Sequence, residues 1–367
     1  MQNNIAIYFY GGMAEIYQLN QWMDVFNLLS HSVKLKIVVR NKKVYNTLIC
    51  NIDLDIVYVD TINDLLSYYE KIDFKVIIYV NNGFKNFQSL IFHRAMHVHI
   101  NHGESEKSSM HSNQSKAYDY VFVSSNIAFE RYKSHLLNFE ENKYLKIGRP
   151  QLDFIDNYNI DTTKKVILYA PTDESTHISM RYTSLERLGL EIVEKILSNN
   201  EYFLIYRPHP STGKNSKIVK DINDKIINKI VNSKNAIVDT KTNILNIFSK
   251  VDIAIFDNSS LIIDFLYYDK PIFMTNMFLK EYHNIDNLKV LDVAILIDEK
   301  NIDNLISNIK LEDQNDSLKE IRNLIKIDYL GNYQKGESTK LFISTIIKIS
   351  EQRDKLLIEN NMMNTLH

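Results

Sequence analysis

The chain has 367 residues, a formal net charge of -2 and a single cysteine. A charge this close to zero argues against a nucleic-acid-binding protein, which usually presents a strongly basic face, and one cysteine excludes an internal disulfide. The first residues lack the pattern of a secretory signal, and no window approaches the roughly 20 apolar residues of a membrane span. We therefore expect a cytoplasmic protein, peripheral to the inner face of the plasma membrane at most, with Cys50 in the core.

Apolar runs alternate with helical segments through the first part of the chain, a pattern typical of βα units on a parallel sheet. Helical spacing is clearest at 15–30 and 126–137. Gly11 and Gly12 follow the first apolar run but lack the G-x-G-x-x-G spacing of a dinucleotide site, which argues against a nicotinamide enzyme. The expected strands are 4–10, 33–39, 55–59, 75–80, 96–100 and 118–123.

A polar turn follows the strand expected at 96–100. Gly103 permits a close or positive-φ backbone there, which would leave the imidazole of His102 exposed beside the next amides. A histidine at a strand end is well placed to take a proton from an alcohol. We expect Glu104 or Glu106 to orient this ring and Lys107 to meet an anionic group.

Two alternatives accompany this turn. His93, His97 and His99 could form a zinc site, but their spacing is irregular and no cysteine or second histidine pair accompanies them, so His97 and His99 are expected to be packed or solvent-facing. The polar run at 108–119 is either an ordered loop or short helix beside the same cleft, or a solvated linker. The residues expected to line this cleft are Gly103, Glu104, Ser105, Lys107, Asn113, Gln114 and Arg149.

A second series of strands begins after the polar stretch 151–163, which shows no apolar period. This break predicts an N-terminal Rossmann-like domain at 1–150 and a C-terminal Rossmann-like domain at 151–335, followed by a C-terminal helix within 336–367. Two such doubly wound α/β domains would face a cleft, with ligands held at the carboxyl ends of both sheets. The strands expected here are 165–169, 202–206, 236–238, 251–256, 271–275 and 290–297.

The prolines mark the ends of several strands. Pro208 and Pro210 flank His209 and hold its backbone extended, while Arg207 adds a permanent forked charge. This pairing suits a phosphate group, although a plain strand-terminating turn also explains it. Pro171 and Thr172 follow the strand at 165–169 and would join the same rim.

The segment 251–268 reads as strand, tight turn and helix. Asp257 or Asn258 can cap the helix, and the hydroxyl groups of Ser259 and Ser260, with the first N–H groups of the helix, would form an anion site. Capping alone accounts for these residues about equally well.

The ordered motifs together resemble the CDP-glycerol glycerophosphotransferases of teichoic acid and capsule synthesis, from about residue 101 to residue 275. The resemblance implies a fold of the glycosyltransferase B (GT-B) type, no cofactor, no catalytic metal and action at the inner face of the bacterial membrane. It also implies that the domain at 1–150 is the acceptor-side domain and that the domain at 151–335 binds the nucleotide donor. His102 matches the catalytic histidine of the family, His209 its second essential histidine, and Ser259 and Ser260 its donor-phosphate serines. The motifs are His102-Gly103, Gly148-Arg149-Pro150-Gln151-Leu152-Asp153, Ala170-Pro171-Thr172, Arg207-Pro208-His209-Pro210 and Asp257-Asn258-Ser259-Ser260.

The implied reaction is displacement at the β-phosphorus of CDP-glycerol by a hydroxyl group of an oligosaccharide or lipid-linked glycan, with release of CMP. The segment 104–107 departs from the Thr-Pro-Leu-Lys of polymerase members and leaves the acceptor open. A sugar transferase using a nucleotide-activated sugar is the competing enzyme, and a non-catalytic binding scaffold is a third hypothesis. The lysine-rich segment 214–234 could lie on anionic lipid or form an ordinary solvated helix.

Overall fold

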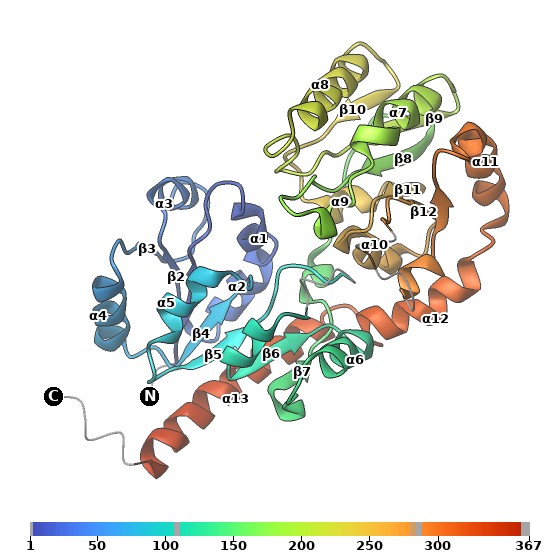
Figure 1. Cartoon of the computed structure of the whole chain (residues 1–367). Helices are drawn as coiled ribbons and strands as arrows, with labels where there is room; N and C mark the ends of the chain where they lie inside the picture. Colours follow the sequence, from blue (N-terminus) through green and yellow to red (C-terminus); the bar gives the residue numbers. More distant parts are fainter. Residues whose placement is uncertain (1–2, 106–110, 280, 282, 284–287, 361–367) are drawn as a thin grey trace. The chain divides into compact units, whose positions relative to one another are not determined.

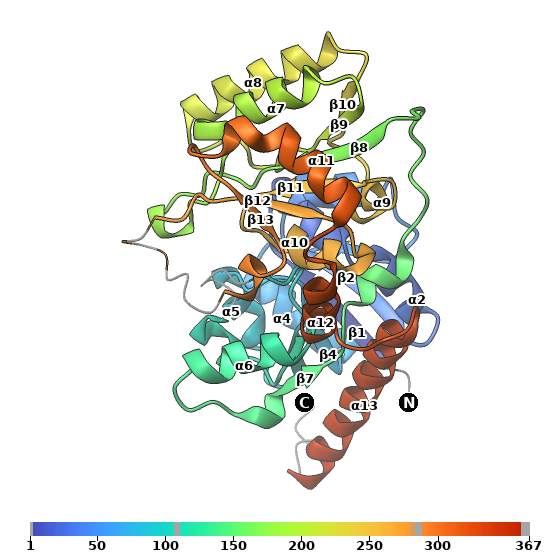
Figure 2. The same ribbon diagram turned by 90° about the vertical axis from the view of Figure 1, so that its right-hand side faces the viewer.

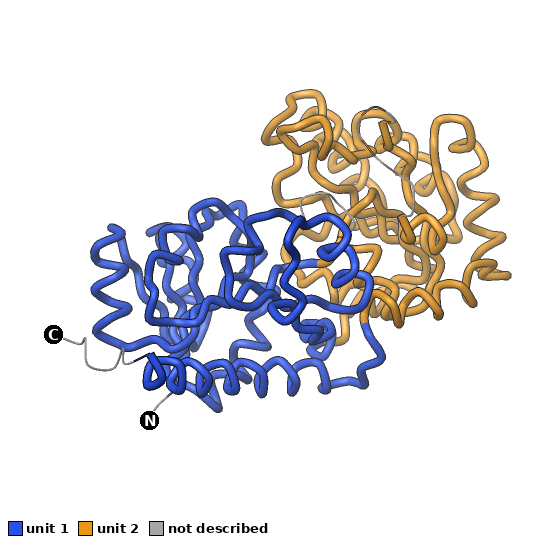
Figure 3. The backbone as a smooth tube through the Cα atoms, turned by 60° about the horizontal axis from the view of Figure 1, so that its bottom comes forward, with its two compact units in different colours: residues 1–103, 111–154, 331–367 blue, residues 104–110, 155–330 orange. Residues whose placement is uncertain are grey.

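The structure is a computed structural model that describes residues 3–105, 111–279, 281, 283 and 288–360. Two compact units divide the chain (Figure 3): unit 1 holds 1–103, 111–154 and 331–367, and unit 2 holds 104–110 and 155–330. The division therefore falls after Phe154 and again after Leu330, and the C-terminal segment belongs to unit 1. None of the described helices has the length and apolar character needed to cross a bilayer.

Unit 1 contains a seven-stranded parallel sheet in the order β3-β2-β1-β4-β5-β6-β7 (Figure 1). The six expected strands are all present. The short β7 was missed, because its three residues, one buried, one half-buried and one exposed, form no apolar run. The strands are β1 Asn4–Phe9, β2 Lys34–Val39, β3 Ile56–Tyr58, β4 Val76–Tyr79, β5 Met96–His99, β6 Tyr120–Val123 and β7 Tyr144–Lys146.

Helices cover both faces of this sheet. One core joins the sheet to α1, α2, α3 and α13, and the other joins it to α4 and α6. The predicted helix at 15–30 is two helices, and Cys50 is exposed rather than buried because it follows the last turn of α3. The helices are α1 Ile16–Asn20, α2 Met23–Ser30, α3 Lys42–Leu48, α4 Ile62–Ile72, α5 Phe87–Leu90, α6 Asn126–His135 and α13 Glu337–Glu359.

Unit 2 contains a six-stranded parallel sheet in the order β10-β9-β8-β11-β12-β13. The strand predicted at 290–297 is wrong in its first half: Lys289–Leu291 is a 3-10 turn, and Asp292 interrupts the apolar run before the strand begins. The strands are β8 Lys165–Ala170, β9 Tyr202–Tyr206, β10 Ala236–Val238, β11 Ile253–Phe256, β12 Ile272–Thr275 and β13 Ile295–Ile297.

The sheet of unit 2 is also covered on both faces (Figure 2). Its main core packs the strands against α7, α8 and α11, so the apolar side of α8 is used inside the unit. Val219, Ile226 and Ile230 are the buried residues of that helix, as in an ordinary amphipathic surface helix. The helices are α7 Leu190–Leu197, α8 Lys217–Val231, α9 Ile244–Phe248, α10 Ser260–Phe265, α11 Leu305–Asn315 and α12 Lys319–Leu330.

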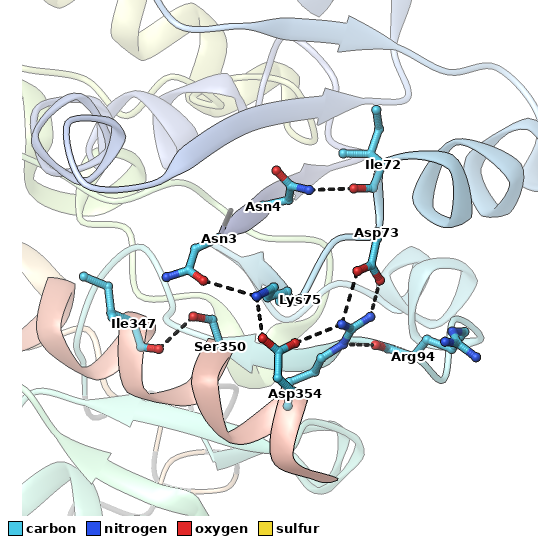
Figure 4. Close-up of polar contacts among 10 residues, drawn as sticks. Asn3, Asn4, Ile72, Asp73, Lys75, Arg94, Ile347, Ser350 and Asp354 are labelled. Carbon is cyan, nitrogen blue, oxygen red and sulfur yellow. Dashed lines mark hydrogen bonds and ion pairs between the residues drawn. The ribbon is translucent and has the colours of Figure 1, made fainter. Parts of the chain in front are cut away.

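A charged cluster fastens the end of α13 to unit 1 (Figure 4). The buried guanidinium of Arg353 donates from Nε to the carbonyl of Arg94 at 2.8 Å and forms an ion pair with both oxygens of Asp73. Asp354, the next residue, accepts from Arg353 at 3.1 Å and from Lys75 Nζ at 2.5 Å. Arg353 and Lys75 are both nearly inaccessible to solvent, so the ion pairs with these carboxylates replace the water that would otherwise stabilise their charges.

We expect Arg353→Leu to lower the free energy of unfolding by about 2–4 kcal/mol, because it removes the hydrogen bonds to Asp73 and the Arg94 carbonyl and leaves buried polar atoms unpaired. Urea denaturation followed by circular dichroism measures this loss. Lys355→Leu removes an exposed cation of the same helix and is the control. Equal free energies of unfolding for the two variants would contradict a stabilising role for the charged cluster.

Candidate active site

Each sheet has one point at which the strand order reverses. In unit 1, β1 pairs with both β2 and β4; in unit 2, β8 pairs with both β9 and β11. Ligands of open parallel sheets bind beyond the carboxyl ends of the strands at such a switch point. The loops after β8, β9 and β11 in unit 2, and those after β1, β4 and β5 in unit 1, are therefore the segments expected to bind ligands.

Asp257 ties three segments together at the switch point of unit 2. Its Oδ2 accepts from the backbone N–H of Thr172 at 2.7 Å and of Ser184 at 3.1 Å, and its Oδ1 accepts from Thr275 Oγ1 at 2.5 Å. Complete burial raises the pKa of Asp257 above its ordinary value, and these hydrogen bonds offset only part of the rise. Both carboxylate oxygens are occupied by protein donors, so Asp257 holds the loop after β8 in place beside the end of β11.

Glu174 ties the loop after β8 to the loop after β9. This carboxylate is 2% exposed and accepts from the backbone N–H groups of Gly213 at 3.1 Å, Asn215 at 2.7 Å and Ser216 at 3.1 Å. Gly213 has a φ of +77°, and a Cβ there would lie 2.8 Å from Lys220 Cβ, so this close turn requires glycine. The result is a fixed loop that begins at Arg207 and ends at α8.

His209 lies in that fixed loop, between its two prolines. Its Nδ1 accepts from the backbone N–H of Ser211 at 3.1 Å, and its carbonyl accepts from Thr212 N at 2.9 Å. A ring nitrogen that accepts an N–H carries no proton, so the neutral imidazole has its proton on Nε2. The partly exposed ring is thereby set as an Nε2–H donor.

Arg207 is paired inside the protein. Its Nη1 donates to the carbonyl of Asp239 at 2.9 Å and to Asp239 Oδ1 at 3.1 Å, which joins the ends of β9 and β10. Burial lowers the pKa of Arg207. Burial alone would raise the pKa of Asp239, but hydrogen bonds from Thr242, Tyr158 and Lys241 bring it below its usual value. Arg207 is therefore held by an ion pair with Asp239 at the carboxyl ends of β9 and β10.

The turn after β11 differs from the expected capped helix. Ser259, not Asp257 or Asn258, is the N-cap of α10, and its side chain makes no capping hydrogen bond. The buried Ser259 Oγ and Asn258 Oδ1 have no hydrogen-bond partner among the described residues. Ser260 is partly exposed. Two buried polar atoms that lack protein partners at a switch point are typical of a ligand site.

The loop after β5 carries His102 in unit 1. Asn101 has a φ of 53°, so the left-handed residue is Asn101 rather than Gly103; asparagine tolerates this conformation. The indole N–H of Trp22 donates to the Asn101 carbonyl at 2.7 Å, and Asn101 Oδ1 accepts from His102 N at 2.9 Å. The partly exposed His102 ring meets Tyr17 edge to face, with centroids 5.8 Å apart. These contacts fix the position of the ring.

The other predicted residues have varied environments. Glu104 and Ser105 are buried and belong to unit 2 by the division of the chain, and Gly103 is buried in unit 1. The run after 110 is an ordered 3-10 helix at Asn113–Ala117, in which Ser112 Oγ accepts from Gln114 N at 3.2 Å. Pro171 is buried, and Lys107 and Glu106 lie outside the described residues.

The Gly148–Asp153 motif positions the C-terminal helix of unit 1. Asp153 accepts from Gly336 N at 2.7 Å and from Thr339 N at 2.9 Å, at the start of α13. A Cβ on Gly148 would lie 2.6 Å from Ser338 Oγ, so glycine allows this close approach. Arg149 is buried in the same segment. The sequence pattern gave no sign of this packing role, because its partner lies almost 190 residues away.

His97 and His99 are packed residues, as predicted. His97 bonds to the Tyr79 hydroxyl at 2.7 Å and the Phe92 carbonyl at 2.8 Å, and His99 stacks on Tyr118 with centroids 5.0 Å apart. Among the described residues, no group of three or more histidine, cysteine or acidic side chains is arranged to hold a metal ion.

Acid should destabilise unit 1 through His99. Burial lowers the pKa of His99 to about 4 from 6.5, so between these values the unfolded chain binds the proton first and stability falls as the pH decreases. Full protonation of His99 should lower the free energy of unfolding by about 3 kcal/mol. His99→Phe keeps the ring stack and removes the titration. Urea denaturation at pH 7 and pH 4.5 should show a smaller loss in the variant than in the parent; parallel losses would contradict this account.

A groove of about 630 Å³ lies elsewhere on unit 2, lined by Leu185 and by residues of α7 and α8. Its charged side chains form ion pairs with one another or with nearby residues of opposite charge, as Lys195 does with Glu191 and Asp303 and Glu194 does with Lys229. It lies on the helical face of the unit rather than at the carboxyl ends of the strands, so it is a solvated groove between helices.

Two doubly wound parallel sheets with polar loops at their switch points define an α/β protein of the GT-B type, and solved structures support this. The wall teichoic acid polymerase TagF matches with a TM-score of 0.62 at 16% identity over 96% of this chain and 90% of that chain. A putative UDP-N-acetylglucosamine 2-epimerase from Listeria monocytogenes matches with a TM-score of 0.61 at 12% identity, over 96% of this chain and 98% of that chain. A glycosyltransferase from Rickettsia africae matches with a TM-score of 0.57 at 13% identity, over 95% of this chain and 98% of that chain.

The sequence itself is more specific than the fold. Residues 35–348 match the family described as CDP-glycerol:poly(glycerophosphate) glycerophosphotransferase, and the chain belongs to this family. Curated proteins gave no match. The family and the transferase class predicted from the motifs are confirmed.

Proposed function

We propose that this enzyme transfers glycerol phosphate from CDP-glycerol to a hydroxyl group of a cell-surface glycan and releases CMP. The main support for this proposal is the set of three loops that Asp257 and Glu174 join at the switch point of unit 2. These loops present His209 and the hydroxyl group of Ser259, which has no hydrogen-bond partner among the described residues. Family membership supplies the donor class.

Unit 2 binds the donor in this proposal. The Nε2–H of His209 donates to a diphosphate oxygen, and the hydroxyl groups of Ser259 and Ser260 donate to others. Arg207 contributes its charge from its fixed position on Asp239. Fixed donors suit phosphoryl transfer, in which catalysis depends mainly on alignment and charge stabilisation.

Unit 1 activates the acceptor. The acceptor hydroxyl oxygen forms a bond to the β-phosphorus as the bond to the bridging oxygen of CMP breaks, and the hydroxyl proton passes to the imidazole of His102. CMP leaves with the electron pair of the broken bond. A general base of this kind typically contributes about 10²- to 10⁴-fold to the rate.

Mass spectrometry of both products tests the reaction. Purified protein is incubated with CDP-glycerol and a panel of capsule-like oligosaccharides and short glycerol phosphate primers. We expect CMP and an acceptor heavier by one or more glycerol phosphate units. A transferase that uses a UDP-sugar would instead release UDP and add a sugar mass; this alternative is retained because glycosyltransferases and UDP-sugar epimerases share the fold.

We further propose that the reaction needs no metal ion or other cofactor, because protein donors can stabilise the charge at the phosphates. Activity should therefore persist after dialysis against EDTA, within about twofold of the untreated enzyme. Initial rates of CMP release with and without added Mg²⁺ measure this. Loss of activity in EDTA and recovery with Mg²⁺ would contradict metal independence without affecting the assignment of the donor.

A further inference from the structure

A network of neutral polar side chains surrounds the switch point of unit 1, next to His102. Asn81, in the loop after β4, donates from Nδ2 to Gln18 Oε1 at 2.8 Å, and Gln18 Nε2 donates to the Tyr17 hydroxyl at 3.4 Å. Tyr17 in turn meets the ring of His102. All four side chains are partly exposed, so a ligand can reach them. Tyr17 and Gln18 lie in α1, which follows β1, and Asn81 and His102 lie in the loops after β4 and β5; these three strands are adjacent.

Buried residues hold this network in place. Asn86, which is 1% exposed, donates from Nδ2 to the Asn81 carbonyl at 2.6 Å and to the Tyr118 hydroxyl at 2.8 Å. At the end of β1, the Tyr10 hydroxyl lies against Gly83 so closely that a Cβ there would lie 1.5 Å from it. The loop after β4 is thus fixed both by hydrogen bonds and by a close contact that only glycine permits.

The chemistry of the network selects the kind of ligand. Two amides and a phenol offer both donors and acceptors, which match hydroxyl groups that also donate and accept. The two hydrogen bonds that join Asn81, Gln18 and Tyr17 run between amide and phenol groups, without a charged partner. A phosphate group would favour the charge-assisted bonds of arginine or lysine.

We propose that Tyr17, Gln18 and Asn81 form the acceptor subsite, which binds a neutral, hydroxyl-rich end of the acceptor, a sugar or a polyol, and presents its terminal hydroxyl group to His102. This inference rests on the proposed function and adds to it the chemical class of the acceptor terminus. Gln18 is a specificity-determining residue in this scheme, because it accepts from Asn81 and donates to Tyr17.

Two primers test the subsite: a short oligo(glycerol phosphate) that ends in a free glycerol, and the same primer capped by a terminal phosphate monoester. Saturation-transfer NMR without donor measures binding to the full chain. We expect the free-ended primer to bind at least tenfold more tightly than the capped one. Gln18→Leu should weaken binding of the free-ended primer and raise its KM about tenfold, while the KM for CDP-glycerol stays unchanged.

Gln352→Leu is the matched control, because Gln352 accepts from the Tyr120 hydroxyl at 2.8 Å on α13, outside these loops. Wild-type binding and KM in Gln18→Leu, or equal binding of the two primers by the parent, overturns the inference. A different outcome separates the two proposals. If the parent binds the free-ended primer selectively, and Gln18→Leu weakens this binding, but no CMP is released from CDP-glycerol, the subsite stands and the proposed function is overturned. If instead the parent transfers glycerol phosphate from CDP-glycerol and Gln18→Leu does so equally well, the proposed function stands and the subsite is overturned.

Discussion

Replacement of His102 with alanine should lower kcat for CMP release by about 10²- to 10⁴-fold and leave nucleotide affinity unchanged. The expected factor is that of a general base that assists a hydroxyl nucleophile. The backbone N–H of His102 donates to Asn101 Oδ1, and alanine keeps this bond, so the loop should survive truncation. Steady-state kinetics gives kcat, and calorimetry with CMP gives the affinity.

Two controls separate chemistry from folding in this variant. His31→Ala removes an exposed histidine just before β2, at the amino end of the strands, and should keep full activity. Added imidazole should restore part of the activity of His102→Ala, because a free base can occupy the space left by the ring. Normal turnover in His102→Ala would remove the base role from this residue.

The fold was predictable because its information is local. Buried parallel strands are continuous apolar runs, and twelve such runs appeared where the structure has strands. The exceptions have local causes as well: Tyr144–Lys146 is short and only partly buried, and Asp292 interrupts the run before Ile295. The length of α13 could be read from its spacing, but its attachment to unit 1 through Arg353 and Asp73 could not, since that contact spans 280 residues.

The candidate site was predictable only in part. Strand ends followed by proline, glycine, serine or histidine pointed to the loops at the two switch points, because the carboxyl ends of parallel strands share one edge. Glu174 and Asp239 were missed, although Asp239 directly follows β10 and Glu174 lies four residues after β8. Nothing in a sequence shows that one carboxylate accepts three backbone N–H groups of another loop. Residues that position a loop are specified by tertiary contacts, whereas residues that meet a ligand tend to stand at strand ends.

His209→Ala should lower both donor affinity and turnover. A lost hydrogen bond to a charged phosphate costs about 1.5–3 kcal/mol, which corresponds to a rise of about 10- to 100-fold in the KM for CDP-glycerol. If the same bond strengthens as negative charge leaves on CMP, kcat falls as well. Initial rates over a range of CDP-glycerol concentrations separate the two parameters, and calorimetry with CMP measures the loss in the ground state.

A second substitution at this position distinguishes the ring from the loop. In His209→Asn, the amide oxygen can accept the Ser211 N–H that Nδ1 accepts in the parent, so the turn between the prolines is retained. The Nε2–H donor is lost in both variants. If that donor binds the diphosphate, the asparagine variant should be as impaired as the alanine variant, although its loop is intact. Recovery of donor affinity in His209→Asn would instead mean that the histidine acts only by shaping the loop, and the phosphate contact would pass to Ser259 and its neighbours.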